Sequence, residues 1–226
     1  MSIPRPGKII GVGRNYRDHA SELGNTVPAQ PLLFLKPATS VIEDGAPIVL
    51  PPDSKQVDFE GEIGVVIGKL LRRASAQQVR SGIAGITCVN DVTARDLQRT
   101  DEQWTRAKGF DTFCPIGPSV VAIDPDRYAD LEVLCRVNGT VRQHGHARDM
   151  VFSIAALVAF ISQVMTLEPG DLIATGTPAG VGPLHRGDVV EVEIPGVGVL
   201  KNPVIKETIV QVPIENIPRE TGPSAG

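Results

Sequence analysis

The sequence predicts an α+β domain that consists mostly of β-strands, with a few short helices. Short runs rich in Val and Ile, together with 23 glycines and 19 prolines spread over 226 residues, support this prediction. Gly and Pro interrupt regular elements, so their even spread separates many short segments rather than marking one linker. No internal repeat or low-complexity segment occurs. We expect a single domain over residues 1–218, followed by a flexible tail over 219–226.

The expected strands are apolar runs bounded by turn residues. Asn138-Gly139 lies between two of these runs and is the strongest short signal for a hairpin turn. The expected strands cover residues 9–12, 32–35, 41–42, 48–50, 59–67, 85–89, 120–122, 131–137, 172–175, 189–194 and 199–204.

Three helices interrupt the strands. Asn15 is the expected N-cap of the first helix and Gly24 its stop signal, while Ser153 is the expected N-cap of the third. The third helix is apolar on most faces, which favours a place in the core. The predicted helices cover residues 16–23, 76–81 and 154–165, with a further helical turn over 94–98.

The composition excludes several classes of protein. A net charge of -4 without a basic patch gives no reason to expect nucleic acid or an anionic membrane as a partner. Three cysteines without a C-x-x-C spacing argue against a disulfide framework or a thiolate zinc site, and favour free thiols in a reducing cytosol. The N-terminus lacks the pattern of a signal peptide, and the longest apolar stretch is shorter than the ~20 residues of a membrane span. We therefore expect a cytoplasmic protein.

Four weaker motifs do not support a site. Gly11-Val-Gly13 lacks the third glycine of a dinucleotide fingerprint, and the glycine-rich run 176–182 lacks the Lys-Ser/Thr of a phosphate loop. His144-Gly-His146 could place two imidazoles on one strand face, but it lies just past the hairpin turn, where solvated polar residues are expected. His185 stands in a predicted turn and is expected at the surface.

The run Asp58-Phe-Glu-Gly-Glu-Ile carries the main candidate site. Side chains alternate along a strand, so Glu60 and Glu62 share a face, with their Cα atoms about 7 Å apart. Asp91 follows the next strand-like run, at a strand end where ligands are commonly presented. Three carboxylates without His or Cys favour a hard cation, Mg²⁺ first and then Mn²⁺ or Ca²⁺. The alternative interpretation is a solvated acidic strand face.

His19 and Glu22 are the candidate acid–base pair. Residues three apart are neighbours on a helix, so the Glu22 carboxylate can orient the imidazole and raise its basicity. An ordinary pair of surface residues remains the alternative.

Six blocks of sequence, in order, resemble the fumarylacetoacetate hydrolase superfamily. The resemblance extends over about residues 8–204 and is strongest to the short members, of the acylpyruvate hydrolase and oxaloacetate decarboxylase type. The blocks are GVGRNYRDH at 11–19, PLLFLKP at 31–37, DFEGEIGVVIG at 58–68, NDVTARDLQ at 90–98, WTRAKGFDTFCP at 104–115 and GDLIATGTPAGVG at 170–182.

This resemblance implies a fold, a cofactor and a set of roles. The fold would be a mixed β-sandwich roll, usually assembled as a homodimer. Mg²⁺ or Mn²⁺ would be bound by Glu60, Glu62 and Asp91. His19 and Glu22 would form the catalytic dyad, on a short lid helix at about 15–24. Lys108 matches the active-site lysine, and the positions implied to contact substrate are Arg95, Gln98 and Thr177.

The implied reaction breaks a carbon–carbon bond of a small 2-oxo acid. Acylpyruvate hydrolysis, such as that of fumarylpyruvate, is the first expectation, with His19 deprotonating the attacking water. Oxaloacetate decarboxylation and a 2-hydroxyhepta-2,4-diene-1,7-dioate isomerase or decarboxylase activity in aromatic catabolism remain open, because all could proceed at the same site. A non-catalytic protein that binds metal and oxo acid is the alternative from another class.

Overall fold

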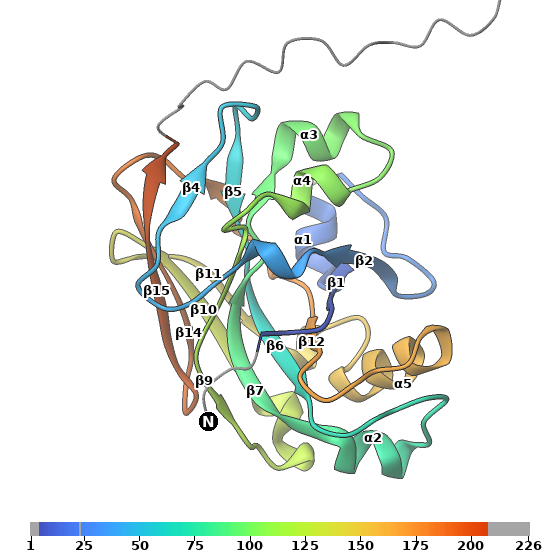
Figure 1. Ribbon diagram of the computed structural model, residues 1–226. Helices are drawn as coiled ribbons and strands as arrows, with labels where there is room; N and C mark the ends of the chain where they lie inside the picture. The colour runs from blue at the N-terminus through green and yellow to red at the C-terminus, as the bar shows by residue number, and fades with distance from the viewer. Residues whose placement is uncertain (1–4, 23, 208–226) are drawn as a thin grey trace, which may run out of the picture.

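The computed structural model describes residues 5–22 and 24–207, and the expected tail at 219–226 lies outside the described residues. These residues form three sheets, of seven, five and three strands, with a few short helices (Figure 1). The mostly β class predicted from the sequence is confirmed.

The seven-stranded sheet carries the centre of the molecule. It is mixed, because β1 runs parallel to β12 and β3 runs parallel to β9, while the other pairs are antiparallel. In spatial order its strands are β2 (Leu32–Lys36), β1 (Ile9–Gly13), β12 (Leu172–Ala174), β6 (Gly61–Ile67), β7 (Ile83–Asn90), β9 (Cys114–Val121) and β3 (Val41–Ile42).

The five-stranded sheet lies against β6, β7 and β9 (Figure 1). Its hairpin between β10 and β11 turns at Asn138 and Gly139, both in the left-handed region at φ 53° and 76°, as the Asn-Gly pair predicted. In order this sheet contains β11 (Thr140–His146), β10 (Glu132–Val137), β14 (Val189–Ile194), β15 (Gly198–Lys206) and β4 (Ile48–Leu50), and the small sheet contains β13 (Gly182–Pro183), β5 (Val57–Phe59) and β8 (Thr93–Ala94).

Side-chain caps fix the first residue of two of the helices. Ser75 and Ser153 both cap helices with their side chains, and the cap at Ser153 confirms the sequence prediction. The helices are α1 (Arg17–Glu22), α2 (Ala76–Gly82), α3 (Arg95–Thr100), α4 (Thr105–Gly109) and α5 (Ile154–Val164), with 3-10 helices η1 (Ala38–Ser40), η2 (Pro125–Asp130) and η3 (Ala147–Asp149).

The predicted cap at Asn15 is wrong. Its side chain is fully buried and links two distant segments: its amide group donates to the carbonyls of Phe152 and Thr175, and its oxygen accepts from the Phe152 N–H. These bonds satisfy an otherwise buried backbone, which outweighs the local role of a cap. Helix α4 was not predicted, because it has no apolar periodicity.

The expected strand 59–67 is split at Glu60. Strand β5 pairs with the small sheet and β6 with the large one, so the chain changes sheets between Phe59 and Gly61. Gly61 lies where the two large sheets pack closely together, since a Cβ there would be 2.9 Å from that of Cys135. Side chains of β6 do alternate as predicted, with Ile63 and Val65 in the core between the sheets.

The described residues hold three free and buried cysteines, in agreement with the sequence prediction. Within the same residues, no helix is both long and apolar enough to span a membrane.

Candidate metal centre and active site

The three predicted carboxylates come together at the break between β5 and β6. The N–H of Glu60 donates to the side-chain oxygen of Asn90 (2.9 Å), and the carbonyl of Glu60 accepts from the N–H of Asp91 (2.9 Å). Glu62 follows as the second residue of β6. Glu60, Glu62 and Asp91 are all at most 4% exposed, and one ligand oxygen from each lies within 4.8 Å of the others.

Buried cations offset most of this negative charge. Lys108 Nζ bridges Glu60 (2.8 Å) and Asp91 (2.6 Å), and Lys36 Nζ lies 2.6 Å from the other oxygen of Asp91. The guanidinium of Arg95 binds Asp58 at 2.8 Å and also forms an ion pair with Glu60. Lys36 was not identified from the sequence as a site residue, because its contact with Asp91 joins positions 55 residues apart.

The pKa shifts follow from this balance. Burial alone would raise the pKa of Glu60, but Lys108, Arg95 and His19 outweigh it and hold that pKa well below its usual range. Burial would likewise lower the pKa of Lys108, but Asp91 and Glu60 raise it. Glu62 forms no ion pair among the described residues. Burial, Asp91 and Glu60 raise its pKa well above the ordinary value, and the opposing effects of the Lys108 charge and of the Gly176 N–H at 2.8 Å do not outweigh them.

This donor set fits a hard divalent cation. Glu62 is a buried carboxylate whose ionised form is only partly compensated by Lys108, and a cation shared with Glu60 and Asp91 would supply the missing positive charge. Oxygen ligands alone favour Mg²⁺ or Mn²⁺ over zinc. Glu60, Glu62 and Asp91 are therefore the residues that would hold the ion.

His19 and Glu22 lie on α1 beside this cluster. His19 Nδ1 is 3.3 Å from a carboxylate oxygen of Glu22, as the i, i+3 spacing predicted. The Glu22 carboxylate is held in turn by the backbone N–H of Gly180, at 3.1 and 3.3 Å. His19 is only 6% exposed, so it is not an ordinary surface residue.

A pocket of about 440 Å³ joins these groups, within the size range of small-molecule sites. It is lined by all nine site residues predicted from the sequence: His19, Glu22, Glu60, Glu62, Asp91, Arg95, Gln98, Lys108 and Thr177. Seven further lining residues were not identified as site residues from the sequence: Val12, Gly13, Arg14, Asn25, Phe34, Arg99 and Trp104. Phe34 and Trp104 pack edge to face with ring centroids 5.5 Å apart, and Lys108 Nζ lies 4.9 Å from the Phe34 centroid.

Two of the residues implied to contact substrate are also held by the protein. Arg95 binds Gln98 in addition to its carboxylates. The Thr177 hydroxyl donates to the carbonyl of Gly61 (2.9 Å) and accepts from the side-chain amide of Gln143 (2.7 Å). Both residues therefore help to shape the pocket, whatever they contribute to binding.

Gln143 is a positioning residue that sequence reasoning missed. From the inner face of β11 its amide oxygen accepts from the N–H of Gly61, between the two glutamates, and its NH₂ group donates to Thr177 and to the carbonyl of Pro178. The side chain is 1% exposed. The only signal in the sequence is the alternation along this strand. Gln143 and Gly145 take its two buried positions, whereas the residues between and before them are exposed.

Fold and site together define a β-roll with a buried three-carboxylate centre beside a His–Glu pair. Residues 8–205 match the family described as fumarylacetoacetate (FAA) hydrolase, C-terminal. The mitochondrial oxaloacetate tautomerase FAHD2A of Homo sapiens is 44% identical, over 90% of this chain and 68% of the relative.

Two solved structures are also similar. The 2-hydroxyhepta-2,4-diene-1,7-dioate isomerase of Mycobacterium marinum is 48% identical with a TM-score of 0.82, over 91% of this chain and 77% of the other. The 5-carboxymethyl-2-hydroxymuconate delta-isomerase of Mycobacterium smegmatis is 46% identical with a TM-score of 0.83, over 91% and 81%. The chain belongs to the fumarylacetoacetate hydrolase family, whose members are enzymes.

Replacing Glu62 by Gln should abolish tight binding of the divalent cation. The amide keeps the size of the side chain but removes the charge that the ion needs, so the affinity for Mn²⁺ or Mg²⁺ measured by titration calorimetry should fall by more than about 100-fold. The exposed Glu43→Gln variant is the matched control and should bind as the wild type does. Unchanged affinity in Glu62→Gln would contradict the assignment of this centre.

Replacing Gln143 by Leu should destabilise the protein and disturb the site together. Gly61 N–H, Thr177 Oγ and the Pro178 carbonyl all lose a buried partner, at about 1–3 kcal/mol for each group left unsatisfied. We expect the free energy of unfolding in urea to fall by at least about 2 kcal/mol. The neighbouring solvent-facing variant Arg142→Ala should change it by less than about 0.5 kcal/mol; equal effects of the two would contradict the role of Gln143.

Proposed function

We propose that this protein is a divalent-metal enzyme that moves a proton next to the oxo group of a small 2-oxo dicarboxylic acid, as in keto–enol tautomerisation or double-bond isomerisation. The observation that carries the proposal is the His19–Glu22 pair, which lies in the same pocket as the three carboxylates. The names of the three relatives, one tautomerase and two isomerases, support this class of reaction.

Glu60, Glu62 and Asp91 would hold Mg²⁺ or Mn²⁺. When bound, the cation would supply Lewis acidity toward a 2-oxo group and so make the neighbouring C–H bonds more acidic.

His19 would be the group that carries the proton. With Nδ1–H donating to Glu22, the other ring nitrogen keeps its lone pair and can accept a proton from carbon. The same nitrogen can return that proton to an oxygen or to another carbon of the substrate, so the reaction balances without water. Glu22 is fixed by Gly180, which keeps the imidazole in one orientation.

Lys108 would remain charged throughout, because Asp91 and Glu60 raise its pKa. Its ammonium group would keep Glu60 and Asp91 in place and would add positive charge where substrate oxygens bind. Arg95, Gln98 and Thr177 line the same pocket and are proposed to contact the substrate there.

The presence of Arg14 and Arg99 in the pocket favours a substrate with a second carboxylate. Both line the pocket, and neither forms an ion pair within residues 5–22 and 24–207. Arg14 also holds a left-handed backbone conformation (φ 59°), which is uncommon for a residue other than glycine and often marks a functional position. Two unpaired guanidinium groups in one pocket suit a dianionic acid.

Acylpyruvate hydrolysis is the second candidate. Glu22 is 33% exposed, so water can reach the pair, and His19 could deprotonate a water that attacks the distal carbonyl. Oxaloacetate decarboxylation, which needs no water, could use the same centre.

Two further expectations from the sequence, the homodimer and the lid helix at 15–24, stay predictions.

Replacing His19 by Ala should lower kcat for enol–keto conversion of oxaloacetate by about 10²–10⁴-fold, the range for loss of a general base. The decay of the near-ultraviolet absorbance of the enol measures this rate, with fumarylpyruvate and acetylpyruvate assayed in parallel for hydrolysis. The exposed His185→Ala variant is the control and should retain full activity. Full turnover by His19→Ala, or by protein stripped of metal with a chelator, would overturn the proposal.

Replacing Arg99 by Gln should discriminate dianionic from monoanionic substrates. If this guanidinium binds the far carboxylate, KM for oxaloacetate should rise about tenfold or more, by the energy of a charge-assisted hydrogen bond. The rate with a monocarboxylic 2-oxo acid should be unaffected in a side-by-side assay. An equal change for both acids would show that Arg99 does not recognise the second carboxylate.

A further inference from the structure

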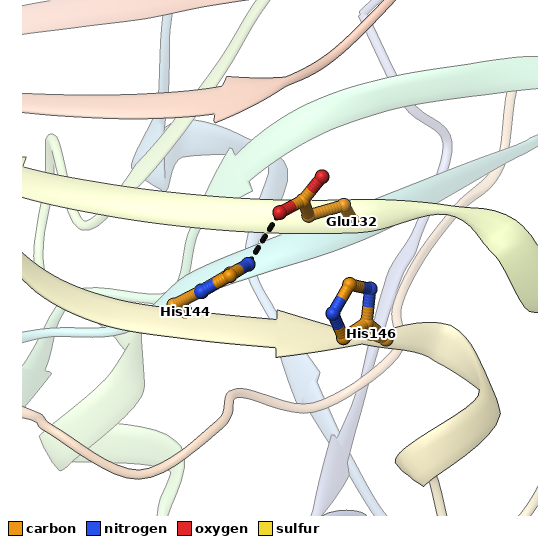
Figure 2. Close-up of side chains that lie close together, drawn as sticks. All are labelled: Glu132, His144 and His146. Atoms are coloured by element: carbon orange, nitrogen blue, oxygen red, sulfur yellow. Dashed lines mark hydrogen bonds and ion pairs between the residues drawn. The ribbon is translucent and has the colours of Figure 1, made fainter.

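A second group of metal-ligating side chains lies away from the pocket, on the outer face of the five-stranded sheet. His144 and His146 are two apart on the edge strand β11 and so point to the same side, and Glu132 stands opposite His146 on β10 (Figure 2). Ligand atoms from the three residues lie within 4.8 Å of one another, and the two imidazole centroids are 5.2 Å apart. The inward-facing neighbour on the same strand, Gln143, belongs to the pocket side of the sheet.

An ordinary ion pair explains only part of this group. His144 Nε2 contacts the Glu132 carboxylate, as the dashed line in Figure 2 marks. His146 has no part in that pair: its Nδ1 is shielded from solvent and finds no hydrogen-bond partner among residues 5–22 and 24–207. A buried ring nitrogen without a partner costs free energy, so its place beside a second imidazole and a carboxylate needs an explanation.

A bound cation would account for the gathering of these three side chains. Two imidazoles and one carboxylate form a set that suits Zn²⁺, which binds His nitrogen at about 2.0–2.1 Å and carboxylate oxygen at about 2.0–2.2 Å. Imidazole ligands favour zinc, copper and nickel over magnesium, whereas the three carboxylates of the pocket have the opposite preference. The two clusters therefore differ in the class of ion that each would take.

We propose that Glu132, His144 and His146 form a second metal site, which binds Zn²⁺ or a similar borderline cation. The ion takes the place of the proton between His144 and Glu132 and is also bound by a ring nitrogen of His146. His144, which is 50% exposed, and Glu132, which is 32% exposed, both have room to rotate toward a shared ion. Three protein ligands leave at least one position for water.

The ion would join the edge strand β11 to β10. The two strands already pair along their length, but their register shifts between Cys135 and Arg136, and β11 has no partner on its other side within the described sheet. A shared ion near the end of the hairpin would hold β11 against its neighbour. We therefore expect Zn²⁺ to raise the thermal unfolding midpoint of the protein as well as to bind.

Co²⁺ is the probe that tests the site, because its visible absorption reports nitrogen ligation and low coordination number directly. The full chain is titrated with Co²⁺ in a large excess of Mg²⁺, which occupies the carboxylate centre. We expect one Co²⁺ for each chain, with an intense visible band that Zn²⁺ displaces. His144→Ala and His146→Ala should each weaken Co²⁺ binding by more than about tenfold, since loss even of an outer partner of a ligand costs about 10–100-fold.

His185→Ala is the matched control, because it removes an exposed histidine that is also near a carboxylate, Asp188, but has no second imidazole. It should leave the band intact, and Glu132→Gln gives a further ligand variant that preserves size. Circular dichroism verifies that each variant is folded. Absence of the band in the wild type, or a band that survives both His144→Ala and His146→Ala, would overturn the proposal. A band lost only in Glu62→Gln would assign the ion to the pocket and overturn it equally.

Discussion

The burial of four carboxylates at one point of the sheet is the constraint on which the rest of this structure depends. Asp58, Glu60, Glu62 and Asp91 are each no more than 4% exposed. Removing such groups from water costs several kcal/mol for each ion unless partners compensate. The chain therefore brings Lys36, Lys108 and Arg95 from three separate elements into the same region, and all three are themselves buried.

The cations do not compensate all the carboxylates to the same extent. Glu60 and Asp91 are paired with cations, whereas Glu62 has a backbone N–H and a raised pKa. A site with all its carboxylates paired would have little affinity for a further cation, and one with none paired would hardly fold. The intermediate arrangement keeps the protein stable and still leaves negative charge for a divalent ion.

The way in which the sheets meet fixes the positions of the residues in this centre. The switch of the chain between sheets at Glu60 takes that residue out of regular pairing, so its backbone bonds to Asn90 and Asp91 instead. Gln143 then crosses from the second sheet to hold both Gly61 and Thr177. The strand that carries Gln143 inward carries His144 and His146 outward, so one strand supports the pocket on one face and the proposed zinc site on the other.

Local sequence determined most of the elements and the carboxylate chemistry of the site. Val- and Ile-rich runs, the Asn-Gly turn and the Ser153 cap act within a few residues, and the i, i+2 spacing of Glu60 and Glu62 predicted their shared face although the strand breaks at Glu60. Asp91 was grouped with the two glutamates from its place at the end of a strand-like run. The β-roll itself and the roles of Lys108, Arg95, Gln98 and Thr177 came from the resemblance to a family, not from periodicity.

Only the tertiary structure decided the partners that lie far apart along the chain. The contacts of Lys36 with Asp91, of Asn15 with Phe152 and Thr175, and of Gln143 with Gly61 span 55 residues or more, and no local pattern encodes them. Glu132 joined the two histidines for the same reason, because the register between β10 and β11 set which residue stands opposite His146. Short-range propensity forms the elements, but burial of charge and of backbone polar groups decides which of them must meet.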